Sequence, residues 1–599
     1  MPNKKRTPLR KEVPVNDTWD LSPLYAGDAA WEKSFNRIQR MVPKFAQFRG
    51  TLAKSPKNLR ACYDFEVRFD KEAERLGIYA QLKYSEDLGN SAYQGMMARY
   101  MRLATQAGEA ASYIAPEIQA IPRKKMEAFL KDKQLRPYKF QLEKLLRYKP
   151  HTLSAKEERL LAMQGEVAES SHRIFEQLND ADLKFGKVKD ERGRRVELTH
   201  GSFRALLESQ SRRVRKQAFH QFYAAYEAHA NTVAATLNAS VQQDVYVARA
   251  RNYPSALKAA LFADKVPVSV YENLIQAVHN NLETNYRYLE LRRRALKLRD
   301  LHVYDTYLPI VKGVQKKTPY GRAVSMVCEA LEPLGTDYVR TLEAGLRGRW
   351  VDRYENVGKR SGAFSSGGYT GPPYILMNYK DTVLDDVFTL AHEAGHSMHT
   401  WYSAKSQPFQ SYHYAILVAE VASTFNEQLL NHMLIQKARD KKMRAFLINR
   451  EIDQIRLTLV RQTMFAEFEK IIHEAAEQGI PLTVDWFREN YRNLLQLYFG
   501  KSFKLDDALS LECFRIPHFY YGFYVYKYAT GLSAAIALAK KILDGNKTAR
   551  DQYLNFLKSG GSDYPLNLLR NAGVDLETPE PVDAAMNRFQ ELVQALEEL

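Results

Sequence analysis

Helical hydrophobic periodicity extends over most of this chain and restricts it to a mainly α-helical fold. Apolar residues recur at helical spacing in six long segments: 31–48, 93–114, 155–178, 203–250, 269–298 and 321–346. With 599 residues, the chain can form several domains or one large body with two lobes and a cleft between them.

Two short strand-like segments interrupt the helical pattern. Residues 183–188 and 195–198 lie on either side of the charged turn 190–193 and predict a β-hairpin. Before Trp19 the chain is basic and has no apolar periodicity. We therefore divide the chain into a basic flexible tail at 1–14, an N-terminal helical lobe at 15–200 that ends in the hairpin, and a second domain at 201–599.

Charge and cysteine content narrow the functional classes. Lys and Arg exceed Asp and Glu by 87 to 70, a net charge of +17, but the basic residues are spread along helices and no nucleic-acid-binding motif is present. A polyanion binder is therefore a rival hypothesis, and no nucleic acid is expected as partner. Three isolated cysteines indicate a reducing compartment, and no apolar run of about 18 residues is found. We expect a cytoplasmic protein that does not enter the membrane.

A glycine-rich loop precedes the densest motifs. Seven Gly and Pro residues lie between 358 and 373, without the ending of a phosphate-binding loop, and the strand-like segment 374–379 follows. The loop is either a turn-rich connection or a flap that covers a substrate. The strand, if its edge is free, could hold a peptide backbone by strand addition.

A helix with metal-binding spacing follows the loop. Thr382 and Asp385 have the form of a capping box and predict a helix over 383–402. That helix contains His392-Glu393-Ala394-Gly395-His396. Imidazoles at i and i+4 share one helical face and can bind the same ion, while Glu393 can reach a water molecule on it.

A catalytic zinc site needs a third protein ligand. The metzincin pattern fails, because residue 399 is His and residue 402 is Tyr. The first downstream acid is Glu420, which lies in an apolar helical segment; the alternative is a buried carboxylate paired with Arg or Lys. His399 and His413 are alternative ligands. Glu427 either supports a ligand from behind or forms a plain ion pair.

A second constellation is rich in tyrosine. Residues 518–528 contain five tyrosines and His518, and such side chains can donate hydrogen bonds to the oxyanion that develops during peptide hydrolysis. The spacing of Tyr521 and Tyr524 places both on one side of a helix. Phe519, Phe523, Tyr526 and Tyr528 are expected to pack, and the helix that continues to Leu543 is expected to be core.

Together these motifs resemble the oligoendopeptidase F branch of the thimet-oligopeptidase family of zinc metallopeptidases. The resemblance rests on HEAGH, EVASTFNE and PHFYYGFYVYKYATG, with GPPYILMNY and DVFTLAHE upstream. It implies a mainly α-helical fold, with two lobes enclosing a deep central cleft and a small β-sheet edging the active site. It also implies that 201–599 is the metallopeptidase domain and that short oligopeptides are the substrates.

The resemblance further implies roles for individual residues. His392, His396 and Glu420 would bind one Zn²⁺, and Glu393 would be the general base. His518, Tyr521 and Tyr524 would bind substrate or stabilise the oxyanion, with Tyr520 as the alternative to Tyr521. The predicted function is zinc-dependent cleavage of internal peptide bonds. A dipeptidyl carboxypeptidase and a non-catalytic, zinc-stabilised peptide-binding protein are the alternatives.

Overall fold

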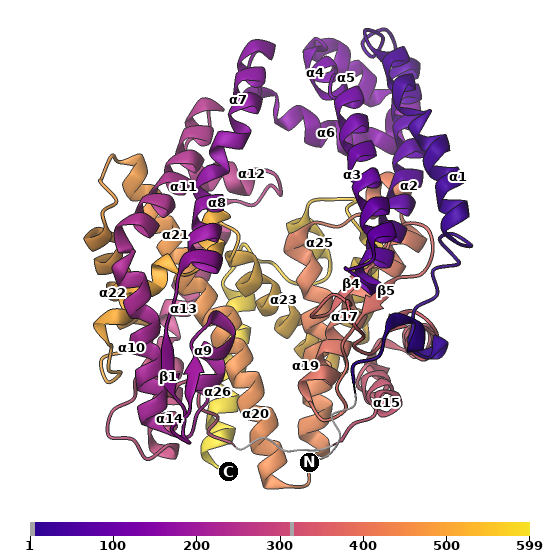
Figure 1. The fold of residues 1–599 in the computed structure, drawn as a ribbon. Helices are drawn as coiled ribbons and strands as arrows, with labels where there is room; N and C mark the ends of the chain where they lie inside the picture. The colour runs from indigo at the N-terminus through magenta and orange to yellow at the C-terminus, as the bar shows by residue number, and fades with distance from the viewer. Residues whose placement is uncertain (1–5, 312–316) are drawn as a thin grey trace. The chain divides into compact units, whose positions relative to one another are not determined.

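A computed structural model of the chain describes residues 6–311 and 317–599 and confirms the mainly α-helical fold (Figure 1). The chain forms two units, and each is assembled from three stretches of sequence. Unit 1 contains Met1–Lys149, Gln315–Met433 and Leu538–Gly573, whereas unit 2 contains Pro150–Val314, Leu434–Ala537 and Val574–Leu599. In the described parts of the chain, no helix combines the length and the apolar character needed to cross a membrane.

The units do not follow the division predicted at residue 200. The N-terminal part of unit 1 buries apolar surface against segments more than two hundred residues away in sequence. Trp19, for example, packs edge-on against Tyr374 with ring centroids 6.2 Å apart, and Leu376 belongs to the same core. Hydrophobic burial, which contributes most to folding, therefore joins distant stretches that periodicity alone cannot pair.

Unit 1 contains two long consecutive helices, α2 (Pro56–Glu86) and α3 (Ser91–Ala111). Ser55 caps α2 by accepting a hydrogen bond from the Asn58 amide, and Asn90 caps α3 in the same way. The helices of unit 1 are α1 (Asp28–Gln39), α2 (Pro56–Glu86), α3 (Ser91–Ala111), α4 (Ile114–Ala120), α5 (Arg123–Lys131), α6 (Lys139–Arg147), α15 (Tyr320–Ala330), α16 (Thr336–Arg347), α17 (Asp385–Ser406), α18 (Phe409–Tyr412), α24 (Lys547–Ser559) and α25 (Pro565–Asn571). Helix α19 (Ile416–Lys437) begins in unit 1 and ends in unit 2.

A three-stranded sheet lies beside these helices. Its order is β3 (Val351–Asp352), β5 (Tyr374–Leu376), β4 (Phe364–Ser366), with β5 parallel to β3 and antiparallel to β4. The predicted strand at 374–379 is therefore the central strand, both of its edges are paired, and strand addition to it is excluded. Its complete burial explains this position, and β4 is the edge strand on the side of α17.

The start of α17 also differs from the prediction. The helix begins at Asp385 with Leu384 as N-cap, so Thr382 and Asp385 form no capping box. Asp386 instead accepts a hydrogen bond from the Lys380 amide at 2.6 Å across the preceding turn. The helix extends to Ser406, one turn beyond the predicted end.

The N-terminal segment is more ordered than predicted. Residues 1–5 of the predicted flexible tail lie outside the described residues. From residue 6 onward the segment packs on unit 1. Arg10 forms an ion pair with the buried Asp352 at 2.5 Å and with Glu86 at 3.1 Å, and the Val357 amide donates to the Pro8 carbonyl. A basic side chain thus neutralises buried carboxylates, a role that charge counting cannot identify.

Unit 2 contains a β-hairpin and a second set of helices. The hairpin pairs β1 (Lys187–Lys189) with β2 (Arg195–Glu197) antiparallel and confirms the prediction. The helices are α7 (Ala155–Ala168), α8 (Ser170–Glu176), α9 (His200–Leu207), α10 (Arg212–Ala228), α11 (Ala230–Ala250), α12 (Ala256–Phe262), α13 (Val268–Asn280), α14 (Leu282–Ala295), α20 (Lys441–Ile455), α21 (Arg461–Glu477), α22 (Val484–Phe499) and α26 (Glu580–Glu597). Helix α23 (Tyr526–Leu543) passes from unit 2 into unit 1 and confirms the helix predicted there.

Candidate metal centre

Helix α17 places two imidazoles side by side in unit 1. His392 and His396 are one helical turn apart, and their ring centroids are 4.9 Å apart. The helix presents its other faces to the core, where Leu390, Ala391 and Ala394 are fully buried. The i, i+4 spacing therefore places both imidazoles on one face of the helix, as predicted.

Helix α19 supplies the third group. Glu420 Oε2 lies 3.4 Å from His392 Nε2 and 3.8 Å from His396 Nε2. The two helices cross closely at Gly395, where an added Cβ would lie 2.4 Å from the Ala422 carbonyl oxygen. Buried Asn426 fixes the crossing further by donating to the Ala391 carbonyl at 3.1 Å. The glycine within the motif therefore allows Glu420 to reach the two histidines.

The donor set fits zinc. One ligand atom from each of His392, His396 and Glu420 lies within 4.8 Å of the others. A tetrahedral ion with ligands at about 2.0–2.2 Å places donor atoms roughly 3.3–3.6 Å apart, close to the measured 3.4 and 3.8 Å. Burial raises the pKa of Glu420, but the hydrogen bond from His392 and the charge of His396 outweigh burial and lower it to about 2. Glu420 is thus ionised, as a ligand must be.

Hydrogen bonds behind the ligands fix their orientation. Glu427 Oε1 bonds to His392 Nδ1 at 2.8 Å, which leaves Nε2 directed at Glu420. Metal-bound histidines commonly donate their second ring nitrogen to such partners. The contact of Glu427 therefore favours ligand support, one of the two roles that the sequence leaves open.

The two alternative histidines lie outside this cluster. His399 is fully buried and stacks on Tyr414 with ring centroids 3.6 Å apart. His413 forms an ion pair with Glu74 at 2.9 Å. Glu74 also accepts a hydrogen bond from the Tyr369 amide at 2.9 Å, so it fastens the glycine-rich loop to α2.

Glu393 is a carboxylate with a perturbed environment. It is 7% exposed, and burial raises its pKa to about 7 despite the opposing charge of His392 and a hydrogen bond with the Ser365 backbone on β4. A carboxylate with a pKa near neutrality can both accept and return a proton. Ser365 is a partner that sequence reasoning missed, because β4 carries no distinctive motif.

The tyrosine-rich segment lies in unit 2 and has an unexpected backbone. A short 3₁₀ helix at Pro517–Tyr520 is followed by a turn before α23 begins. Tyr521 and Tyr524 therefore do not share a helical face, and the prediction from their spacing is wrong. The cause lies at Phe523, whose φ of 57° breaks any helix.

The side chains of this segment fall into two groups. Phe519, Phe523 and Tyr526 are buried, as predicted. Tyr521 is 51% exposed. His518 and Tyr524 stack with ring centroids 6.2 Å apart, and burial lowers the pKa of His518.

Tyr520 is occupied by structural contacts. Its hydroxyl bonds to Thr236 at 2.8 Å, and its ring stacks on Phe175 with centroids 4.4 Å apart. Of the two alternatives, Tyr521 is the one whose side chain is exposed.

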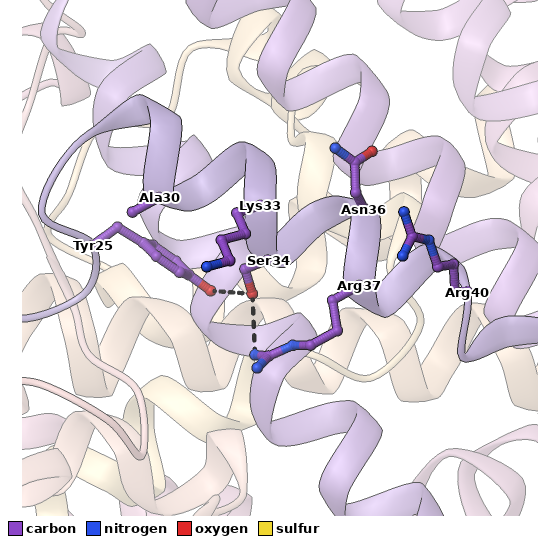
Figure 2. A pocket seen from close by; sticks show the side chains of 7 residues that line it. All are labelled: Tyr25, Ala30, Lys33, Ser34, Asn36, Arg37 and Arg40. Atoms are coloured by element: carbon purple, nitrogen blue, oxygen red, sulfur yellow. Dashed lines mark hydrogen bonds between the residues drawn. The ribbon is translucent and has the colours of Figure 1, made fainter.

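Unit 1 also contains a cavity of about 520 Å³ on α1 (Figure 2). Tyr25, Ser34 and Arg37 form a hydrogen-bonded chain along it, and Arg37 is paired with Glu72 at 2.6 Å. None of its lining residues belongs to the His392–His396–Glu420 cluster.

Known proteins are similar to this chain in sequence and in fold. The pattern of Peptidase family M3 matches residues 205–588, and that of Oligopeptidase F matches residues 117–185. Oligopeptidase PepF of Bacillus subtilis is 44% identical over 99% of this chain and 88% of its own, and an oligoendopeptidase F homolog of Borreliella burgdorferi is 38% identical over 97% and 98%.

Solved structures agree with the sequence comparison. The crystal structure of oligoendopeptidase-F from Enterococcus faecium has a TM-score of 0.74 at 34% identity and covers 95% of this chain and 99% of its own. A crystal structure from Chlamydophila abortus has a TM-score of 0.94 at 36% identity, with 99% and 100% covered. The full-length match in sequence and in fold shows that this chain is a member of peptidase family M3.

Proposed function

We propose that this peptidase is a zinc-dependent endopeptidase that hydrolyses internal bonds of short oligopeptides, with one Zn²⁺ per chain. The observation that carries the proposal is the convergence of His392, His396 and Glu420 within 4.8 Å, one residue from the buried carboxylate of Glu393. The names of the relatives, oligopeptidase and oligoendopeptidase, support the substrate class.

The mechanism follows from the groups around the cluster. His392, His396 and Glu420 would hold the zinc ion, which when bound supplies Lewis acidity toward water and the scissile carbonyl. Glu393 accepts a proton from the attacking water and later delivers it to the departing amine nitrogen. Its raised pKa, about 7, suits both transfers. Glu427 holds the His392 ring in the orientation that keeps Nε2 available.

We assign His518, Tyr521 and Tyr524 to the substrate. Their N–H and O–H groups would donate hydrogen bonds to the oxyanion that forms as water adds to the carbonyl. The exposure of Tyr521 and the stacking of His518 on Tyr524 support this role. The edge strand β4, whose Ser365 backbone bonds to Glu393, is the strand available to an extended peptide.

A reducing compartment such as the cytoplasm is part of the proposal. Cys62, Cys328 and Cys513 are all buried and form no disulfide. Such isolated thiols are typical of proteins from reducing compartments.

The decisive experiment uses a pool of short peptides with blocked and unblocked ends, analysed by mass spectrometry with and without chelator. Chelator-sensitive internal cleavage of blocked peptides is expected. Glu393→Gln should keep zinc but lose at least about a hundredfold in turnover, because the proton acceptor is gone. His392→Ala should lose zinc as well. Glu355→Gln, at an exposed site in the same unit, serves as the matched control.

Other outcomes would redirect the assignment. Cleavage only of unblocked ends would indicate a dipeptidyl carboxypeptidase. A zinc-loaded protein that binds but never cleaves peptides would indicate a non-catalytic peptide-binding protein. Full activity of Glu393→Gln would remove Glu393 as the general base.

A further inference from the structure

The turn between Tyr521 and Tyr524 contains a backbone conformation that needs support. Phe523 has a φ of 57°, in the left-handed region that bulky residues rarely adopt. Its ring is 3% exposed and packs against His473 and Tyr271, with ring centroids 4.4 and 5.9 Å away. Such strained residues persist only where their surroundings fix them. The residue is also flanked by the two tyrosines that we assign to the substrate.

A buried carboxyl group holds the amide of this residue. The Phe523 N–H donates to Glu469 Oε1 at 3.0 Å. Glu469 lies on α21 and is fully buried, and its second oxygen has no hydrogen-bond partner among the described residues. A buried carboxyl with one bond is costly to keep. The only side-chain hydrogen bond of Glu469 among the described residues is the one with the strained Phe523 amide, and it is to this hydrogen bond that we assign a role.

The neighbouring glycine is enclosed from the other side. A Cβ at Gly522 would lie 2.5 Å from Asp244 Oδ2. Asp244 is itself held by His473 Nε2 at 3.1 Å, and His473 Nδ1 bonds to the Glu469 carbonyl at 2.7 Å. The turn at 522–523 is thus fixed by one connected set of groups from α21 and α11.

We propose that Glu469 is a positioning residue for the reaction, because its bond to the Phe523 amide fixes the turn that orients Tyr521 and Tyr524 toward the substrate. The inference rests on the proposed function of these tyrosines. Glu469 itself touches no reacting atom. Burial and the nearby Asp244 raise the pKa of Glu469 well above its usual range, and the side chain of glutamine carries an oxygen that can accept the same hydrogen bond from the Phe523 amide. Glutamine can therefore take its place.

The test compares two substitutions at this position with purified, zinc-loaded protein and a blocked peptide. Glu469→Leu keeps the side-chain size and the helix but removes the acceptor. We expect kcat to fall by about 10- to 100-fold with KM changed less than about threefold, because oxyanion donors act mainly in the transition state. Glu469→Gln should restore kcat to within about threefold of the wild type. Zinc content should be the same in all three proteins.

A matched control separates positioning from general destabilisation. Glu451, on α20 of the same unit, is also a buried carboxylate, but it pairs with the guanidinium group of Arg588 on α26, whereas the Phe523 amide is bonded to Glu469. Glu451→Leu should lower the urea midpoint and leave kcat within about threefold of the wild type at permissive temperature. If Glu469→Leu and Glu451→Leu have the same kinetic constants, or if Glu469→Gln is as impaired as Glu469→Leu, the proposal is wrong.

A second variant approaches the same turn from the opposite side and serves if Glu469→Leu does not fold. Gly522→Ala adds the Cβ that meets Asp244, so it should lower kcat with the same small effect on KM. Unchanged kcat in Gly522→Ala would contradict a role for the exact position of the turn.

The tyrosines distinguish failure of this inference from failure of the proposed function. Tyr521→Phe and Tyr524→Phe should each lower kcat. If neither does, the assignment of these donors fails first, and the positioning role fails with it. If they lower kcat while Glu469→Leu behaves like the control, the function stands and only the positioning role is removed.

Discussion

At the scale of single residues, this protein contains buried carboxylates whose chemistry depends on their partners. Glu393, Glu427, Glu469 and Glu512 are each less than a tenth exposed, yet each has a different partner. Glu427 contacts an imidazole, Glu469 a backbone amide, and Glu512 the guanidinium groups of Arg461 and Arg515. Their chemistry is therefore decided by the partner, since burial alone would favour the neutral form of all four.

The contact of Glu427 predicts its effect on metal binding. Glu427→Ala removes the acceptor at His392 Nδ1 and should weaken zinc binding by about 10- to 100-fold, as loss of such supporting carboxylates does in other metal sites. Competition with a chromophoric chelator at fixed pH measures this affinity. An unchanged affinity would show that Glu427 forms only an ion pair.

The ion pairs of Glu512 predict a pH dependence of stability. Burial raises the pKa of Glu512, but Arg461 and Arg515 outweigh burial and lower it to about 2. Because the pKa is lower in the folded state, the stabilisation is complete above the ordinary carboxyl pKa and is lost as the pH falls from about 4.5 toward 2. The shift corresponds to roughly 3 kcal/mol.

Urea unfolding of wild type and Glu512→Gln at a series of pH values checks this expectation. The wild type should be more stable at pH 7, and the difference should shrink below pH 4.5. A difference that stays constant down to pH 3 would mean that the charge of Glu512 contributes nothing.

At the scale of elements, the metal centre depends on how closely α17 and α19 cross. Gly395 has no side chain between its helix and the Ala422 carbonyl, and the two histidines lie three residues before and one residue after it. The separation of the helices therefore sets the distance from Glu420 to both imidazoles.

The crossing predicts an unusual effect of alanine. Gly395→Ala should favour the isolated helix by about 1 kcal/mol, but the new Cβ would meet Ala422 at 2.4 Å and push the helices apart. We expect loss of zinc and of activity, measured by metal analysis and peptide cleavage. Gly108→Ala is the matched control, because Gly108 lies in α3 with open space around it and should be neutral or stabilising. Full zinc content in Gly395→Ala would contradict this account.

The elements also show how far sequence reasoning reaches. The pair His392 and His396 could be predicted because helical spacing is local. Glu420 could be predicted because it is the first acidic residue after His396. The turn at Phe523 could not, because its conformation depends on Glu469, 54 residues away in sequence. The pairing of both edges of β5 could not be predicted either, because β3 and β4 are too short to give a recognisable strand pattern in the sequence.

At the scale of the whole molecule, the chain passes between its two units at five points. Three stretches contribute to each unit, and α19 and α23 each belong to both. The family patterns, in contrast, divide the sequence between residues 185 and 205, near the predicted boundary at 200. Sequence similarity and packing therefore partition this chain differently.

This difference predicts the behaviour of fragments. A fragment of residues 1–200 lacks Tyr374 and Leu376, which complete the core around Trp19. It should show no cooperative thermal transition, and mixing it with fragment 201–599 should restore cooperativity if the two associate. Calorimetry of each fragment and of the mixture tests this, with the intact chain as control. A cooperative transition of 1–200 alone would show that it is an independent domain.

The burial of all three cysteines has a practical consequence for spectroscopy. Burial raises the pKa of Cys62 to about 12 and of Cys328 to about 11, so these thiols react slowly with alkylating probes. The three native cysteines should therefore take up little of a probe that is directed at an introduced cysteine. Cysteines introduced at exposed Arg123 in unit 1 and exposed Met163 in unit 2 can carry a pair of dyes without removal of any native thiol. The distance between the two dyes can then be followed while a peptide is bound.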